Sequence, residues 1–209
     1  MIMLVIGVMA ARAQSSSTTI EFNKNMKPAL VLDLPNTTSE VEGTILEKLK
    51  QTGYNPETTG SLFWKKNKTD GFYVFNNVQL PSLSNQKLDM YFKVVKKNNE
   101  EKNNSTLYLM VSSGNENFVS PEGDTTLWNS SRTFLNSFID KTTAYSLEKN
   151  ITTQESALKD AQEKLADLQK DEKGLTEKLK KNQEDQKNRQ LDIDSQTKIL
   201  GDLKSKRKA

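Results

Sequence analysis

The sequence contains neither cysteine nor histidine among its 209 residues. Without cysteine the chain forms no disulfide, offers no thiolate to a metal ion and carries no cysteine-linked lipid. Without histidine it lacks the commonest general base and the commonest neutral metal ligand. The net charge of +3 is small, so the charge balance gives no indication of nucleic-acid binding. We therefore expect no cofactor, no metal ion and no nucleic-acid partner.

Catalysis with the remaining residue types needs a serine–lysine pair or paired carboxylates. Serine and lysine are abundant, but none lies in a nucleophile elbow or a glycine-rich loop. Acidic pairs such as Asp171-Glu172 and Asp192/Asp194 lie among lysines in a helical stretch, where a solvated helix surface is the simpler interpretation. We expect a non-enzymatic protein and keep an enzyme that uses carboxylates alone as an alternative.

Proline and aromatic residues are also absent from Leu147 to Leu203, where apolar residues recur every three or four positions. With Ile151 placed at position a of a heptad, 11 of the 17 a and d positions are apolar and the register never skips. The apolar members of this seam are Leu147, Ile151, Leu158, Ala161, Leu165, Leu168, Leu175, Leu179, Ile193, Leu200 and Leu203. The pattern predicts a left-handed coiled coil over residues 145–209, and hence association with itself or with a partner.

Two geometries satisfy this seam. In the first, one long helix reaches about Lys206 and two or three copies pair along it. In the second, the chain folds back as an antiparallel hairpin, with its turn at Gly174 or between Lys180 and Gln190. Unbroken heptad register across Gly174 favours the long helix, since a glycine inside a helix costs only about 1 kcal/mol. The e positions are mostly uncharged, so strand number and orientation stay open.

Residues 29–144 predict one α+β head domain. The expected elements are a strand over 29–34, a helix whose capping box is Ser39 and Glu42, strands starting near 62, 72, 88 and 107, and a helix from about Thr125. This β-α-β-β-β-β-α order fits an antiparallel sheet with both helices on one face, as in one repeat of the TBP-like fold. No proline or glycine lies between Asp124 and Lys173, so the last helix is expected to continue unbroken into the coiled coil.

The first ten residues are apolar, and Ala11-Arg12-Ala13 fits a signal-peptidase cleavage pattern. The run is too short to span a bilayer. We interpret residues 1–13 as a signal peptide and residues 14–28 as a polar linker. A buried apolar segment is the alternative, because no basic residue precedes the run.

Three tyrosines fall on the sheet face opposite the strict apolar alternation of the predicted strands: Tyr73, Tyr91 and Tyr108. Cross-strand pairing explains them structurally. The functional interpretation is an exposed face that binds a ligand or a glycan.

The C-terminal cluster Lys204-Ser205-Lys206-Arg207-Lys208 is basic. Cations are favourable at the C-terminal end of a helix, and this placement is sufficient to explain the cluster. The same cluster would also allow weak contact with an anionic membrane surface.

Four segments carry a resemblance to known proteins: GFYVFNNVQLP, LDMYFKVV, STLYLMVSSGNENFVS and RTFLNSFI. With the basic coiled-coil end and the leader ending in Ala-Gln, they resemble a family of uncharacterised exported proteins of Bacteroidota-type bacteria. The resemblance implies export to the periplasm or cell envelope and a globular head with a helical tail. It implies no catalytic residue. We thus expect an exported protein that associates with itself, or with another envelope protein, through its coiled coil.

Overall fold

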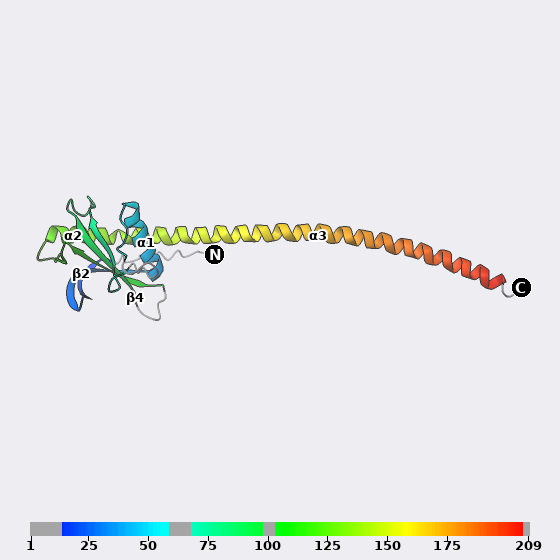
Figure 1. The fold of residues 1–209 in the computed structure, drawn as a ribbon, viewed down its shortest axis with the longest axis horizontal. Helices are drawn as coiled ribbons and strands as arrows, with labels where there is room; N and C mark the ends of the chain where they lie inside the picture. Colours follow the sequence, from blue (N-terminus) through cyan, green and yellow to red (C-terminus); the bar gives the residue numbers. More distant parts are fainter. Residues whose placement is uncertain (1–13, 59–67, 98–102, 207–209) are drawn as a thin grey trace, which may run out of the picture. The chain divides into compact units, whose positions relative to one another are not determined.

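The computed structural model describes residues 14–58, 68–97 and 103–206, and it shows an α+β protein (Figure 1). The elements are β1 (Ser16–Phe22), β2 (Asn25–Leu34), α1 (Thr38–Gln51), β3 (Tyr73–Val78), β4 (Leu88–Lys96), β5 (Ser105–Ser112), α2 (Thr125–Asn136) and α3 (Phe138–Lys206). The chain divides into two compact units after Asn150. We call the first unit the head and the second, from Ile151 onwards, the tail.

The five strands form one antiparallel sheet in the order β1-β2-β5-β4-β3. Helices α1 and α2 pack on one face of it, as the sequence predicts, because their apolar stripes share a single core with that face. Val41 and Ile45 of α1 and Leu135 of α2 are fully buried there beside Phe92 of β4. The predicted α+β class with an antiparallel sheet is therefore confirmed.

Strand β1 lies in the segment predicted as a linker, so the linker over residues 14–28 is wrong. The turn between β1 and β2 explains the hairpin: Asn23 and Lys24 both have positive φ, as a tight two-residue turn requires. As an edge strand, β1 pairs only with β2 and is largely solvent-exposed, so serine and threonine suffice where a central strand needs apolar residues. Because of this polar composition, the sequence pattern does not predict β1 as a strand.

The N-cap of helix α1 lies two residues before the predicted cap. Thr37 is the N-cap, and the capping box joins it to Glu40, whose Oε2 accepts from the Thr37 backbone N at 2.9 Å. The predicted pair of Ser39 and Glu42 is therefore wrong. Both pairs have the same spacing, so the motif alone does not separate them.

The last helix of the head is interrupted at one residue, Ser137, which separates α2 from α3. Its backbone stays right-handed helical, and its N–H still reaches the carbonyls of Thr133 and Phe134. The Ser137 hydroxyl donates to the Phe134 carbonyl at 2.5 Å and so competes for the helix's own acceptors. The expected helix from Thr125 is present, but it is not unbroken.

The opposite face of the sheet carries a smaller aromatic core. Phe22, Phe72 and Tyr91 are buried in it, and Phe118 packs edge-on against Phe22 and Tyr91 at 5.7 and 5.2 Å between ring centroids. The sheet is therefore apolar on both faces near β3 and β4. The strand expected from Leu62 lies outside the described residues.

Candidate functional site

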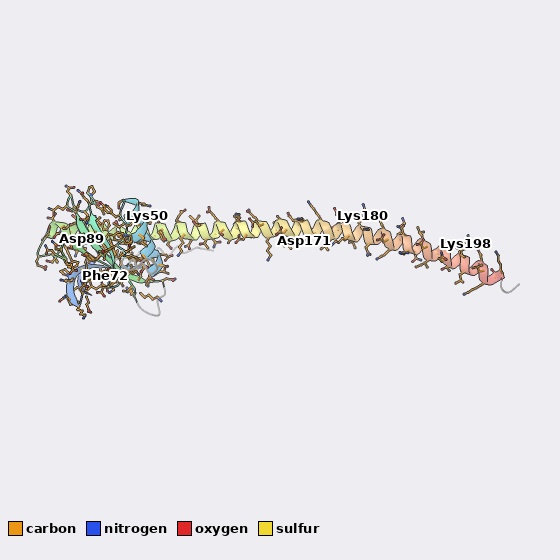
Figure 2. The ribbon with its side chains drawn as sticks, in the orientation of Figure 1. Lys50, Phe72, Asp89, Asp171, Lys180 and Lys198 are labelled. Carbon is orange, nitrogen blue, oxygen red and sulfur yellow. The ribbon has the colours of Figure 1, made fainter. Side chains whose placement is uncertain are left out.

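All eleven seam residues lie on α3, and the tail over residues 151–206 is one continuous helix. No turn occurs at Gly174 or between Lys180 and Gln190, so the long helix of the first geometry is confirmed and the hairpin is wrong, while the pairing of copies stays a prediction. The ten large seam side chains are 41–65% exposed, and Ala161 is exposed as well. Figure 2 shows polar side chains such as Asp171, Lys180 and Lys198 projecting from the same helix.

Two shallow hollows on the tail follow the heptad. The first, of about 440 Å³, is lined by Leu168, Asp171, Glu172, Leu175, Thr176 and Leu179. The second, of about 350 Å³, is lined by Arg189, Asp192, Ile193, Gln196, Thr197 and Leu200. In both, the lining residues occupy positions d, g, a, d, e and a. These are the positions that surround an a knob and a d knob of a parallel partner helix in a coiled coil.

The second hollow repeats the first after three heptads, from Leu168 to Arg189. Since each hollow combines the four-residue holes for one a side chain and one d side chain, its shape suits a facing helix rather than a small molecule. Both lie open on a single helix surface.

Polar seam positions find partners within the helix itself. The Gln186 side-chain amide donates to Asn182 Oδ1 at 2.7 Å, and Arg189 lies 3.9 Å from the Asp192 carboxylate. These residues interrupt the apolar seam in the section where the sequence allowed a turn. Both contacts run along the helix surface, and this section gives little apolar contact to a partner.

The three tyrosines do not form a common face. Tyr73 lies on the helix side of the sheet, in the large core, and its hydroxyl donates to Glu42 Oε2 at 3.0 Å. Tyr91 lies on the other side, buried between Phe22 and Phe118. The predicted placement of Tyr73 is therefore wrong, because Tyr73 pairs across the strands with Phe92, whose side chain faces the helices.

The hydroxyl of Tyr91 is also hard to deprotonate. Burial raises its pKa to about 12, and the carboxylates of Asp89, Glu116 and Glu57 add to the shift. Only Tyr108 keeps partial exposure. A single half-exposed tyrosine gives no stacking platform of the kind that the predicted ligand or glycan face requires. A binding role for these residues stays a prediction that the packing does not favour.

One arrangement in the head escaped sequence reasoning. Lys48 of α1 lines a pocket of about 280 Å³ together with Leu49, Thr52, Leu80, Ser82, Thr133, Phe134 and Ser137. Its ammonium donates a hydrogen bond to Ser137 Oγ and lies over two aromatic rings. Lys48 and Ser137 are 89 positions apart in the sequence, and no local motif marks either residue, so only the folded chain brings them together.

Neither a metal site nor a membrane span was found in the parts of the chain that the structure describes. Within residues 14–58, 68–97 and 103–206, no three acidic side chains come close enough to hold a metal ion. No helix in these ranges is both long and apolar enough to cross a bilayer. No family model, no curated protein and no solved structure matches the chain.

Proposed function

We propose that this is a non-enzymatic exported protein whose tail pairs with a second copy of the same chain. The observation that carries the proposal is the repetition of one hollow, with positions d, g, a, d, e and a, along a continuous helix. A helix whose apolar residues face water gains little stability on its own, and burying the seam against another helix supplies it.

The exposed surface is large enough for a stable pair. Ten leucine and isoleucine side chains, each 41–65% exposed, present on the order of 1,000 Å² of apolar surface per chain. A standard interface uses about 800 Å² from each partner. A copy of the same chain fits best, because it brings an identical apolar repeat of matching length.

Export is supported by the apolar first ten residues and the Ala11-Arg12-Ala13 pattern. The proposed location is the periplasm or cell envelope, and the mature chain would begin at Gln14. Expressing the full gene and sequencing the N-terminus of the product tests this. A product that starts at Met1 would remove export from the proposal without affecting self-association.

Sedimentation velocity on the full chain, at several concentrations, tests the pairing directly. We expect an elongated oligomer for the full chain. Replacing Leu165 and Leu168 with aspartate should give a monomer whose head remains folded, because both charges would enter the seam.

A matched variant controls for charge alone. Ser156→Asp with Ala166→Asp adds the same two charges at positions f and b, away from the seam, and should remain oligomeric. If the wild-type chain is monomeric at every concentration, the tail serves a different protein of the envelope and the proposed self-association is wrong. If both double variants dissociate alike, the seam is not the contact surface.

A further inference from the structure

The pocket beside Lys48 is formed where α1 ends against the junction of α2 and α3. Its walls are mostly apolar, from Leu49, Leu80 and Phe134. Three hydroxyl side chains, those of Thr52, Ser82 and Thr133, complete the lining together with the Lys48–Ser137 pair. At about 280 Å³ the pocket admits a small organic molecule rather than a polymer.

Lys48 is held in this pocket without a counter-charge. Its Nζ hydrogen-bonds to Ser137 Oγ and lies 4.4 Å from the ring centroid of Phe134 and 4.6 Å from that of Phe138. Among the described residues no carboxylate lies within ion-pair distance of it. The charge that contributes to its pKa shift is another cation, Lys141.

The two aromatic rings favour the ammonium form of Lys48, whereas burial and a neighbouring cation favour the neutral amine. Burial, and then repulsion from Lys141, lowers the pKa of Lys48 to about 8, against about 10.4 for a solvated lysine. With this pKa, roughly a tenth of Lys48 is unprotonated at pH 7 and about a quarter at pH 7.5. An amine with a free lone pair, a hydroxyl neighbour and an apolar pocket has the features of a nucleophilic lysine.

We propose that Lys48 is a carbonyl-reactive lysine whose pocket admits small apolar aldehydes and whose Nζ condenses with them to a Schiff base. The amine adds to the carbonyl carbon, and the resulting carbinolamine loses one water to form the imine. No electron is gained or lost, so no oxidant or reductant is required. The inference concerns the head alone and does not rest on self-association.

The chemistry of the pocket selects this ligand class. The apolar walls suit an aryl or short alkyl group, and no acidic group stands near Nζ to hold it as ammonium. Ser137 Oγ accepts from Nζ while donating to the Phe134 carbonyl, so it fixes the amine against the pocket wall. Its place in that chain of hydrogen bonds makes Ser137 a positioning residue.

Lys50 provides an internal control. It lies two residues further along α1, is exposed (Figure 2) and lines no pocket among those described. The full chain would be treated with benzaldehyde at pH 7.5 and trapped with sodium cyanoborohydride, and the modified peptides would be mapped by mass spectrometry. We expect Lys48 to be benzylated at least about tenfold faster than Lys50.

Two variants separate the contribution of the pocket to the modification rate from that of the Lys48 amine. Lys48→Arg keeps the charge over the aromatic rings and should abolish the fast modification. Thr133→Phe fills the pocket from the exposed side of α2 and should slow benzaldehyde but not formaldehyde. The wild-type rate should rise with pH and level off above about pH 8.

The outcomes that overturn the proposal are equally definite. Equal rates at Lys48 and Lys50 would show that the amine is not activated. Fast modification that Thr133→Phe leaves unchanged for both aldehydes would show that the pocket plays no part. Circular dichroism on each variant confirms that the head is folded when the rates are compared.

Discussion

At the residue scale, a glycine of α1, Gly43, lies directly against the ring of Tyr145 of α3 within the head. A methyl group at Gly43 would overlap the ring of Tyr145, whose Cε1 would lie only 2.9 Å away. We expect Gly43→Ala to lower the free energy of unfolding of the head by about 1 kcal/mol, because the partly exposed Tyr145 side chain must shift to make room for the methyl group.

Urea denaturation measures that loss, and the double variant Gly43→Ala, Tyr145→Ala serves as the control. It should recover part of the stability that the single variant loses, since the methyl then has room. If the double variant is simply the sum of two losses, Gly43 does not owe its identity to Tyr145.

Lys48 makes the stability of the head depend on pH. Its folded pKa of about 8 lies below the value of about 10.4 in the unfolded chain. Between those values the unfolded state binds more protons, so the free energy of unfolding rises with pH through this window. We expect a rise on the order of 1 kcal/mol between pH 7 and 9.5.

Lys48→Met should flatten this rise, as measured by urea denaturation at several pH values. Staying below pH 9.5 keeps the buried Tyr91 out of the measurement, since its pKa of about 12 separates from the unfolded value only above pH 10. A pH dependence that persists unchanged in the variant would assign it to another group.

At the element scale, Gly174 sits inside α3 with open space around it. Its backbone is ordinary helix, so an added methyl meets nothing and removes the entropic cost of glycine. We expect Gly174→Ala to stabilise the tail by about 1 kcal/mol and to raise its melting temperature, followed by circular dichroism at 222 nm. A loss of stability would indicate that the glycine faces a partner too closely for a side chain.

Glu172 is the charged residue within the first hollow's a and d rows. It interrupts the apolar seam between Leu168 and Leu175, so pairing must desolvate it or push it aside. Glu172→Leu should lower the concentration at which the oligomer dissociates by at least about tenfold. Equilibrium sedimentation measures this, and unchanged association would place Glu172 outside the contact.

The elements also show what sequence could and could not reveal. The helical repeat from Leu147 to Leu203, the helix from Thr125 and the strands β4 and β5 carry strong periodicity, and the structure contains all of these elements, with an interruption of the helix at Ser137. Strand β1 was missed because an edge strand of serine and threonine has no apolar alternation to detect. The Lys48–Ser137 pair was missed for a different reason, since no pattern in either segment announces a contact between them.

At the scale of the whole molecule, the lack of native cysteine makes orientation measurable. Residues at d positions meet their own counterparts in a parallel, in-register pair. We expect Leu168→Cys to form a disulfide-linked dimer on oxidation, because this alignment matches all 11 apolar positions of the seam. Glu163→Cys, at position f, should remain uncrosslinked. An antiparallel pair would leave Leu168→Cys uncrosslinked while sedimentation still reports a dimer.

The polar breaks in the seam have one further effect. A second copy that slid by three heptads would meet hollows of the same outline, but apolar residues would oppose one another at only three places: Leu147 with Leu168, Leu158 with Leu179, and Leu179 with Leu200. The irregular spacing of Gln154, Glu172, Asn182 and Arg189 thus favours one alignment of the two helices, the one in register. A copy shifted by three heptads loses most of the apolar contact. In-register pairs are therefore favoured over staggered chains, which would overlap one after another and grow into fibres.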